Sequence, residues 1–172
     1  MAQAANQPRE RRKSREPAHA ELDLQRYFPY RLARLAEQVS LAVAEVYATR
    51  FSLSRQEWRI LAVLGTRTEL PTKEIGRLTT LDKMSVSRAM QTLETRGVVT
   101  RVRDPNDGRE RIVALTPAGH ALYSKIVPYA LEREAVLLEV LTPQEIATLD
   151  RVIEKLGRAA AHATHEDGGD RS

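Results

Sequence analysis

Apolar side chains recur every three or four positions in several stretches of the chain, the spacing that places them on one face of a helix. The first stretch predicts a helix from Phe28 to about Arg50, with Pro29 in its first turn. Its apolar stripe is formed by Phe28, Leu32, Leu35, Val39, Val43 and Val46. This stripe is too long for the core of one small lobe to cover.

Capping signals predict the starts of the next helices. The segment SRQE at 54–57 is a capping box, in which Ser54 and Glu57 satisfy each other's backbone N–H groups, and Trp58, Leu61 and Leu64 follow as an apolar face. Thr72 is the predicted cap of a short helix ending near residue 78. A further helix over 83–96 is expected to start after Asp82 and to stop at Gly97, because these residue types favour the two helix ends.

A hairpin and two long helices complete the pattern. The segments VVTRVR and IVALT favour strands on either side of DPNDGRER at 104–111, where Asn, Asp and Gly suit a tight turn. TPAG at 116–119 and TPQE at 142–145 each begin a helix, with Thr116 and Thr142 as caps. The last helix has an apolar face, and its composition turns polar from His162, which predicts fraying. That face consists of Ile146, Leu149, Val152, Ile153 and Leu156.

The order of elements predicts a mainly α fold with a small antiparallel β-hairpin wing. It is a winged helix-turn-helix with N- and C-terminal dimerisation helices, because two copies of the chain would cover each other's apolar stripes. The predicted divisions are a disordered basic arm (1–20), an N-terminal dimerisation helix (21–53), a winged helix-turn-helix lobe (54–116), C-terminal dimerisation helices (117–163) and a disordered tail (164–172).

Composition removes several classes of function. The chain has 172 residues and no cysteine, which excludes disulfides, thiol catalysis and thiolate zinc sites. No apolar run approaches the roughly 20 residues of a membrane span, so we expect a cytoplasmic protein without a membrane partner. The four histidines (His19, His120, His162 and His165) are scattered, HATHE lacks zincin spacing, and no Gly-rich phosphate loop is present. We therefore expect neither an enzyme nor a bound cofactor or metal.

Positive charge is concentrated in the N-terminal tail and the middle third of the chain. The formal net charge is +4 overall, and the segments 1–20, 21–53, 54–116 and 117–172 carry +3, 0, +4 and −3 respectively. A basic middle between neutral and acidic flanks favours a polyanion-binding surface. The alternative is an ordinary solvated face.

A helical wheel over 83–96 separates two faces. Val86, Ala89, Met90 and Leu93 share the side that faces the core. In a helix-turn-helix the second helix enters the major groove, about 12 Å wide, and side chains of its other face read bases or hold phosphates. Arg88 suits a guanine contact and Met84 a thymine methyl group. The predicted DNA-binding residues of this helix are Lys83, Met84, Ser85, Ser87, Arg88 and Gln91. Alone, such a helix is equally compatible with an ordinary exposed polar face.

The hairpin supplies a second candidate contact with double-stranded DNA. Arg109 at its tip suits the negative potential of the minor groove, and Asp107 is placed to orient the guanidinium by a charge-assisted bond. Arg111 belongs to the same basic tip. The alternative is local charge balance within a solvated turn.

Three segments resemble the core of the MarR (multiple antibiotic resistance regulator) family: SRAMQTLETRGVVTR, DPNDGR and LTPAG, in that order and at the family's spacing. EWRILAVL before them also fits, and the resemblance covers roughly residues 25–160. It implies a dimeric DNA-binding regulator whose terminal helices pair two subunits, with wing roles for Asp107 and Arg109. One departure is Gly108, where many members of the family carry an arginine.

The resemblance also implies control by a small ligand, since members of the family commonly bind aromatic or anionic molecules between the dimer helices and the DNA lobe. The residues that suit such a pocket are Tyr27, Tyr30, Arg31, Arg34, Trp58 and Tyr123. The expected effector is an aromatic carboxylate or its coenzyme A thioester, and the expected function is that of a ligand-released repressor. Aromatic residues at helix junctions are also typical core residues. A winged-helix protein-interaction adaptor without sequence-specific DNA binding is the alternative function.

Overall fold

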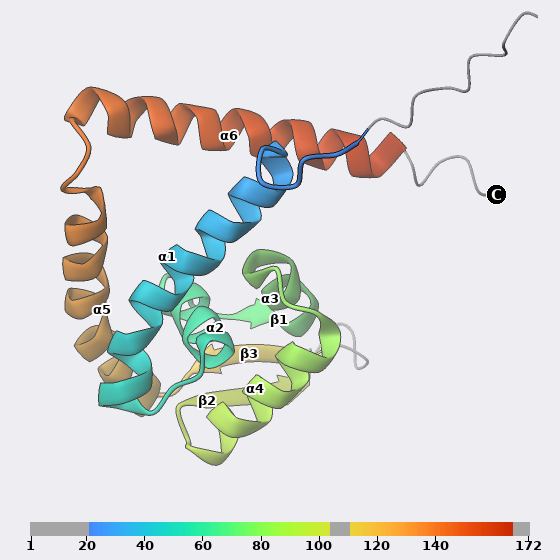
Figure 1. Ribbon diagram of the computed structural model, residues 1–172. Coiled ribbons are helices and arrows are strands. Elements are labelled where there is room, and N and C mark those ends of the chain that lie inside the picture. Colours follow the sequence, from blue (N-terminus) through green and yellow to red (C-terminus); the bar gives the residue numbers. More distant parts are fainter. Residues whose placement is uncertain (1–20, 104–110, 167–172) are drawn as a thin grey trace, which may run out of the picture. The chain divides into compact units, whose positions relative to one another are not determined.

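The computed structural model describes residues 21–103 and 111–166, and Figure 1 labels its helices and strands. The described residues form two compact units that divide after Ala36. The helices are α1 (Phe28–Phe51), α2 (Arg55–Gly65), α3 (Thr72–Thr79), α4 (Lys83–Thr95), α5 (Pro117–Leu138) and α6 (Pro143–Glu166), and the strands are β1 (Leu70–Pro71), β2 (Val99–Arg103) and β3 (Arg111–Leu115). This order confirms the predicted mainly α fold with a small antiparallel wing.

The sheet has three strands in the order β1-β3-β2, all antiparallel. The sequence predicted only two strands, and β1 was missed because two residues are too short to show an alternating pattern. Leu70 lies opposite Val113, so β1 forms an edge of the sheet beside the second strand of the hairpin. Pro71 is tolerated there because an edge strand needs fewer backbone donors.

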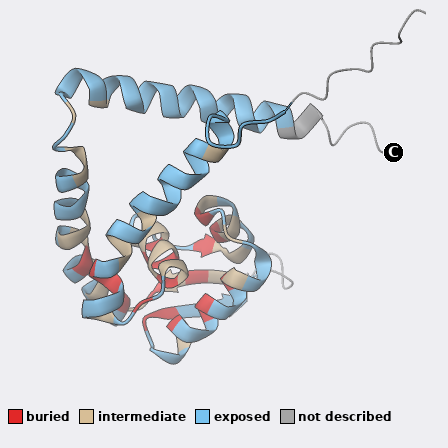
Figure 2. Ribbon diagram, viewed as in Figure 1, coloured by how far each residue is buried: buried red, intermediate tan, exposed pale blue. Residues whose placement is uncertain are grey.

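The core of the second unit lies between the sheet and the helices of the lobe, where Figure 2 shows the buried residues. Its fully buried members include Ile60, Leu61 and Leu64 of α2, Ile75 of α3, Met90 and Leu93 of α4, Val113 of β3 and Ile126 of α5. Burying each such side chain contributes about 1.5–3 kcal/mol. The amphipathic helices therefore hold the sheet and α4 in one fixed lobe.

Most predicted caps are present. Ser54 and Glu57 form the full capping box at the start of α2, and Thr116 accepts a hydrogen bond from the Gly119 N–H at the start of α5. Thr142 and Glu145 bond reciprocally before α6, and the bonds from Thr142 lower the pKa of the Glu145 carboxyl.

Two helix ends differ from the prediction. Thr72 is not a cap, because Pro71 already occupies the extended cap position and Thr72 is the first helical residue. Its hydroxyl instead donates to the carbonyl of Arg111, at 3.0 Å, which ties α3 to β3. The last helix does not fray at His162 but continues to Glu166, since the alanines at 159–161 are strong helix formers.

The apolar stripe of α1 is divided between two environments. Its C-terminal part is buried in the second unit, where Val46 and Tyr47 are 8% and 2% exposed. Its N-terminal part is exposed, with Phe28, Leu32 and Leu35 each near half exposure. α6 is drawn almost entirely as exposed in Figure 2, although it carries Leu149, Val152, Ile153 and Leu156. Among the described residues, these four apolar side chains are 38–56% exposed.

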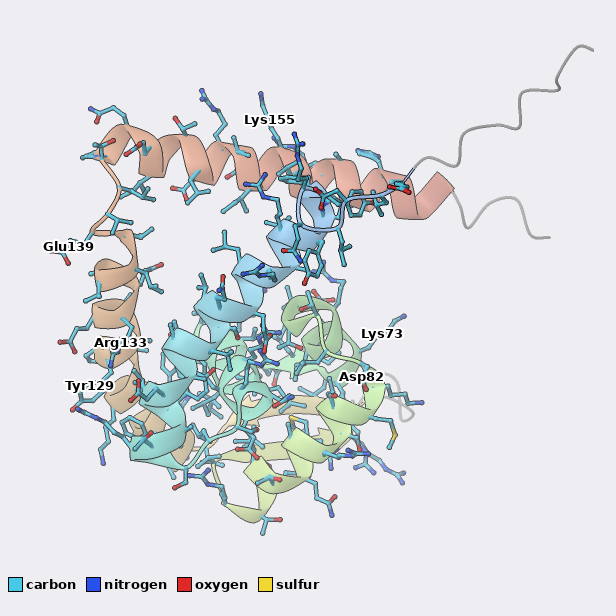
Figure 3. The ribbon with its side chains drawn as sticks, in the orientation of Figure 1. Lys73, Asp82, Tyr129, Arg133, Glu139 and Lys155 are labelled. Carbon is cyan, nitrogen blue, oxygen red and sulfur yellow. The ribbon has the colours of Figure 1, made fainter. Side chains whose placement is uncertain are left out.

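The C-terminal end of α1 also contacts α5. The Arg50 guanidinium lies over the Tyr129 ring, 4.5 Å from its centroid, and the rings of Phe51 and Tyr129 are 6.0 Å apart. Tyr129 and Arg133 are labelled on α5 in Figure 3, and Arg133 approaches Glu45 of α1 to 3.9 Å. Within the described ranges, no helix combines the length and apolar character that crossing a membrane requires.

Candidate nucleic-acid interface and ligand-binding wall

Helix α4 starts at a strong cap. Asp82, labelled in Figure 3, accepts hydrogen bonds from the backbone N–H groups of Met84 and Ser85, both at 2.9 Å. The Ser85 hydroxyl donates to the other carboxylate oxygen at 2.6 Å. The bonds from the Ser85 hydroxyl and backbone, with that from Met84, lower the pKa of the Asp82 carboxyl. The first turn of α4 is therefore fixed in direction.

The two faces of α4 are those that the helical wheel predicted. Val86, Ala89, Met90 and Leu93 are buried in the core. The opposite face presents Lys83, Met84, Ser87, Arg88 and Gln91 to solvent. Ser85 differs from this group, because it is half-buried and its hydroxyl is engaged by Asp82. The exposed side chains are available to a duplex, and their contact with DNA stays a prediction.

A bidentate ion pair ties α4 to the wing. The Nε and Nη2 atoms of Arg101 on β2 donate to the two carboxylate oxygens of Glu94, at 2.8 and 2.5 Å. Further along the ribbon, Arg103 and Arg111 lie directly opposite each other in the ladder, and both are exposed. Asp107 and Arg109 lie outside the described residues. The described base of the wing therefore presents a pair of facing arginines beside the predicted reading helix.

A basic groove of about 650 Å³ lies between α3, α4 and the β2–β3 ribbon. Five cationic residues line it: Lys73, Arg77, Lys83, Arg101 and Arg111. Arg77 is paired with Glu74, and the hydrogen bond between them lowers the pKa of that carboxyl. Lys73, labelled on α3 in Figure 3, has no ion pair within the part of the chain that the structure describes, and neither has Lys83. The sequence indicated only that residues 54–116 carry a net positive charge, and it did not place these cations in a groove.

Three aromatic rings form a second feature, here called the aromatic wall: Tyr47 of α1, Trp58 of α2 and Tyr123 of α5. Tyr47 and Trp58 are stacked with centroids 5.8 Å apart, and Trp58 and Tyr123 with centroids 6.3 Å apart. The Tyr123 ring lies against Gly65, where an added Cβ would come within 2.4 Å of it. Glycine at 65 therefore allows the third ring to reach the stack.

Positive charge lies near this wall. Burial raises the pKa of the Tyr47 hydroxyl, and the charges of Arg55 and Arg59 partly oppose that shift. Arg55 is engaged by Glu37 and Ser40, whereas Arg59 is half-buried and makes no hydrogen bond or ion pair with another described residue. Sequence reasoning missed Tyr47 and Arg59. Tyr47 follows Val43 by four residues, and that helical spacing is the signal that could have found it.

The predicted effector residues divide between the two compact units. Trp58 and Tyr123 belong to the second unit and meet in the aromatic wall. Tyr27, Tyr30, Arg31 and Arg34 belong to the first unit, where Arg34 donates to Gln25 at 3.2 Å and Tyr27 is 44% exposed. That all six form one pocket stays a prediction.

Comparison with known proteins identifies the family. Residues 51–110 match the sequence profile of the MarR family. The HTH-type transcriptional regulator YkoM of Bacillus subtilis is 31% identical over 109 residues, covering 63% of this chain and 69% of that protein. The chain belongs to the MarR family of transcriptional regulators. This confirms the resemblance drawn from the three sequence segments.

Two further matches are a curated sequence relative and a solved structure. The homoprotocatechuate degradative operon repressor of Escherichia coli is 22% identical over 120 residues, covering 70% of this chain and 81% of that protein. The crystal structure of a MarR/EmrR family regulator from Acinetobacter matches with a TM-score of 0.74 at 28% identity, covering 82% of this chain and 99% of the other. The likeness to that MarR-family structure supports the winged-helix assignment.

Proposed function

We propose that this MarR-family regulator is a repressor that binds a pseudo-palindromic operator as a homodimer and is released by an aromatic carboxylate or its coenzyme A thioester. The observation that carries the DNA-binding part is the outer face of α4. Arg88 and Gln91 are exposed there, on a helix that is fixed at its start by Asp82 and flanked by the basic groove. Such side chains read base edges, while the cations of the groove suit phosphates.

The homodimer is supported by large apolar side chains that are exposed in the described part of the chain. They lie on α1 and α6, and Phe28, Leu35 and Ile153 are each more than half exposed. Exposed apolar stripes of this kind mark interaction sites, and a two-fold partner would cover the same stripe on both chains. Sedimentation at micromolar concentration should give a dimer, and a monomer that DNA does not convert into a dimer would contradict the proposal.

Operator binding is tested with the DNA upstream of the regulator's own gene. Fluorescence anisotropy against that fragment and against random duplex, at the same salt concentration, measures the specificity ratio. We expect half-sites separated by roughly 10 bp, about one helical turn. Equal affinity for both duplexes would favour an adaptor or a nonspecific binder over a repressor.

The ligand class is supported by the aromatic wall and its neighbouring arginine. Stacked rings suit a flat aromatic ligand, and the half-buried Arg59 suits a carboxylate. The E. coli relative named above is a repressor of an operon that degrades homoprotocatechuate, an aromatic acid. These observations favour an aromatic carboxylate over a purely aliphatic one.

Trp58 provides a direct probe of this site, because it is the single tryptophan of the chain and stands in the middle of the stack. Aromatic acids that bind the wall should change its emission and weaken operator binding over the same concentration range. Arg59→Ala and Arg31→Ala should each reduce affinity for the acid. Equal affinity for wild type and Arg31→Ala would remove Arg31 from the site, and emission that no acid changes would contradict the ligand assignment.

A further inference from the structure

The C-terminal end of the recognition helix is joined to the C-terminal end of α1 by one side chain. Arg96 is the C-cap residue of α4, and its own N–H donates back to the carbonyls of Thr92 and Glu94. Its guanidinium extends to α1, where Nη1 donates to the Ser52 carbonyl at 2.9 Å and Nη2 to the Phe51 carbonyl at 3.0 Å. Two adjacent carbonyls are thus held by one planar fork.

The end of α1 is built to receive this fork. The last carbonyls of a helix lack partners within it, and a cation there interacts favourably with the negative end of the helix dipole. Ser52 adopts a left-handed conformation with φ of 51°, and the N–H of Leu53 returns to the Tyr47 carbonyl at 3.1 Å. This closing turn directs the Phe51 and Ser52 carbonyls to Arg96, while Leu53, 1% exposed, anchors the turn in the core.

A second interaction joins the same turn of α4 to the wing. Glu94 holds Arg101 of β2 through its bidentate pair, two residues before Arg96. The last turn of α4 is therefore tied to the wing on one side and to α1 on the other. The predicted reading residues Met84, Ser87 and Arg88 belong to the opposite, N-terminal half of the same helix.

We propose that Arg96 is a positioning residue that fixes the angle between α1 and the recognition helix, and thereby the half-site spacing that the homodimer accepts. This inference rests on the proposed function, in which α1 belongs to the dimer and α4 reads DNA. Apolar contacts of Tyr47 and Leu53 also hold α1, but such contacts are non-directional, whereas a two-pronged guanidinium fixes orientation. One base pair of spacing changes the separation of the half-sites by about 3.4 Å and their relative rotation by about 34°.

The test is a spacing profile of operator affinity. Palindromic duplexes with half-site centres from about 8 to about 12 bp apart are titrated at one salt concentration. Wild type should bind one half-site spacing best and lose roughly tenfold in affinity for each base pair by which the spacing departs from it. This loss is comparable to that caused by one mismatched base pair. Arg96→Ala should bind the best spacing more weakly and lose only roughly threefold per base pair. Arg96→Lys keeps the charge but carries all its N–H donors on one nitrogen, so it should give an intermediate profile.

Arg67→Ala is the matched control, because it removes an exposed arginine of the same lobe whose side chain makes no hydrogen bond or ion pair with another described residue. It should lower affinity at every spacing by one common factor, since lost charge or stability does not depend on spacing. An Arg96→Ala profile parallel to that of wild type would overturn the inference. If Arg96→Ala does not fold, as judged by circular dichroism, a parallel profile for Arg96→Lys overturns it. A wild-type protein without any spacing optimum would instead contradict the proposed homodimeric operator binding.

Discussion

Gly119 lies in the first turn of α5, at a position where one added methyl group should strongly destabilise the fold. An added Cβ would lie 2.0 Å from the carbonyl oxygen of Val98 and 3.3 Å from the Cβ of Leu115. The obstacle at Val98 is backbone, which cannot rotate away as a side chain can. Relief to 3.0 Å, the shortest separation such atoms tolerate, requires α5 and the segment before β2 to move apart by about 1 Å.

That movement would break specific bonds. The Thr116 N–H donates to the same Val98 carbonyl at 3.1 Å, and the Thr116 hydroxyl donates to the Gly97 carbonyl at 2.7 Å. Losing two hydrogen bonds costs about 1–3 kcal/mol, and overpacking adds a further 1–3 kcal/mol. Alanine offsets about 1 kcal/mol of this through its higher helix propensity. Gly119→Ala should therefore lower the free energy of unfolding by about 1–5 kcal/mol.

Gly76→Ala is the matched control, since it makes the same change in a helix with room for the methyl group. The nearest atoms to its Cβ would be the Leu81 carbonyl oxygen at 3.7 Å and a Val86 methyl at 3.8 Å, which are ordinary contacts. We expect a change of no more than about 1 kcal/mol, in the stabilising direction. Urea denaturation of all three proteins at one protein concentration measures both effects. Equal stability of Gly119→Ala and wild type would refute the argument from backbone contact.

Three further predictions concern DNA and acid. Arg88→Ala should weaken binding to the operator by about 1–3 kcal/mol more than binding to random duplex, as measured by anisotropy, and an equal loss would indicate a phosphate contact. Arg109→Ala should lower operator affinity, non-additively with the smaller effect of Asp107→Ala, and should reduce the salt slope by up to roughly 2 for the dimer. Unchanged affinity and slope would mean that the wing tip is only a solvated turn. The lowered pKa of Asp82 stabilises the fold above the ordinary value of about 3.9, and this contribution is lost as pH falls through the lower folded pKa. As pH falls between these two pKa values, Asp82→Asn should lose less stability than wild type, measured by acid titration followed by circular dichroism. Equal losses in both proteins would show that the Asp82 carboxylate does not contribute this stability.

Features that depend on neighbouring residues were predictable from the sequence. The capping box at Ser54 and Glu57, the cap at Asp82 and the stop at Gly97 each need only a few consecutive residues, and each is present. The buried face of α4 was predictable because helical periodicity alone sets which side chains share a face. The family was recognisable for the same reason, since its segments are contiguous.

Features that depend on distant residues were not predictable. Strand β1 exists only because Leu70 and Pro71 pair with β3, about 40 positions later, and Thr72 forms its hydrogen bond with Arg111 rather than capping its own helix. The tie between Arg96 and the end of α1 spans 44 residues and has no sequence signal. Tyr47 had a local signal in its helical spacing, but only the fold shows that it stacks on Trp58.

The proposed ligand site and the proposed positioning residue meet on the same turn of α1. Tyr47 forms one side of the aromatic wall, and the Phe51 carbonyl that accepts from Arg96 lies four residues later, about 6 Å along the helix axis. The Leu53 N–H also donates to the carbonyl of Tyr47 itself. The turn whose carbonyls bind Arg96 is therefore hydrogen-bonded to a residue of the proposed ligand site. A ligand that displaces the Tyr47 ring must therefore either leave the backbone of this turn in place or alter the angle of α4 through Arg96. The second case links ligand binding to release of DNA, because a ligand shifts an equilibrium only when it binds the two arrangements with different affinity.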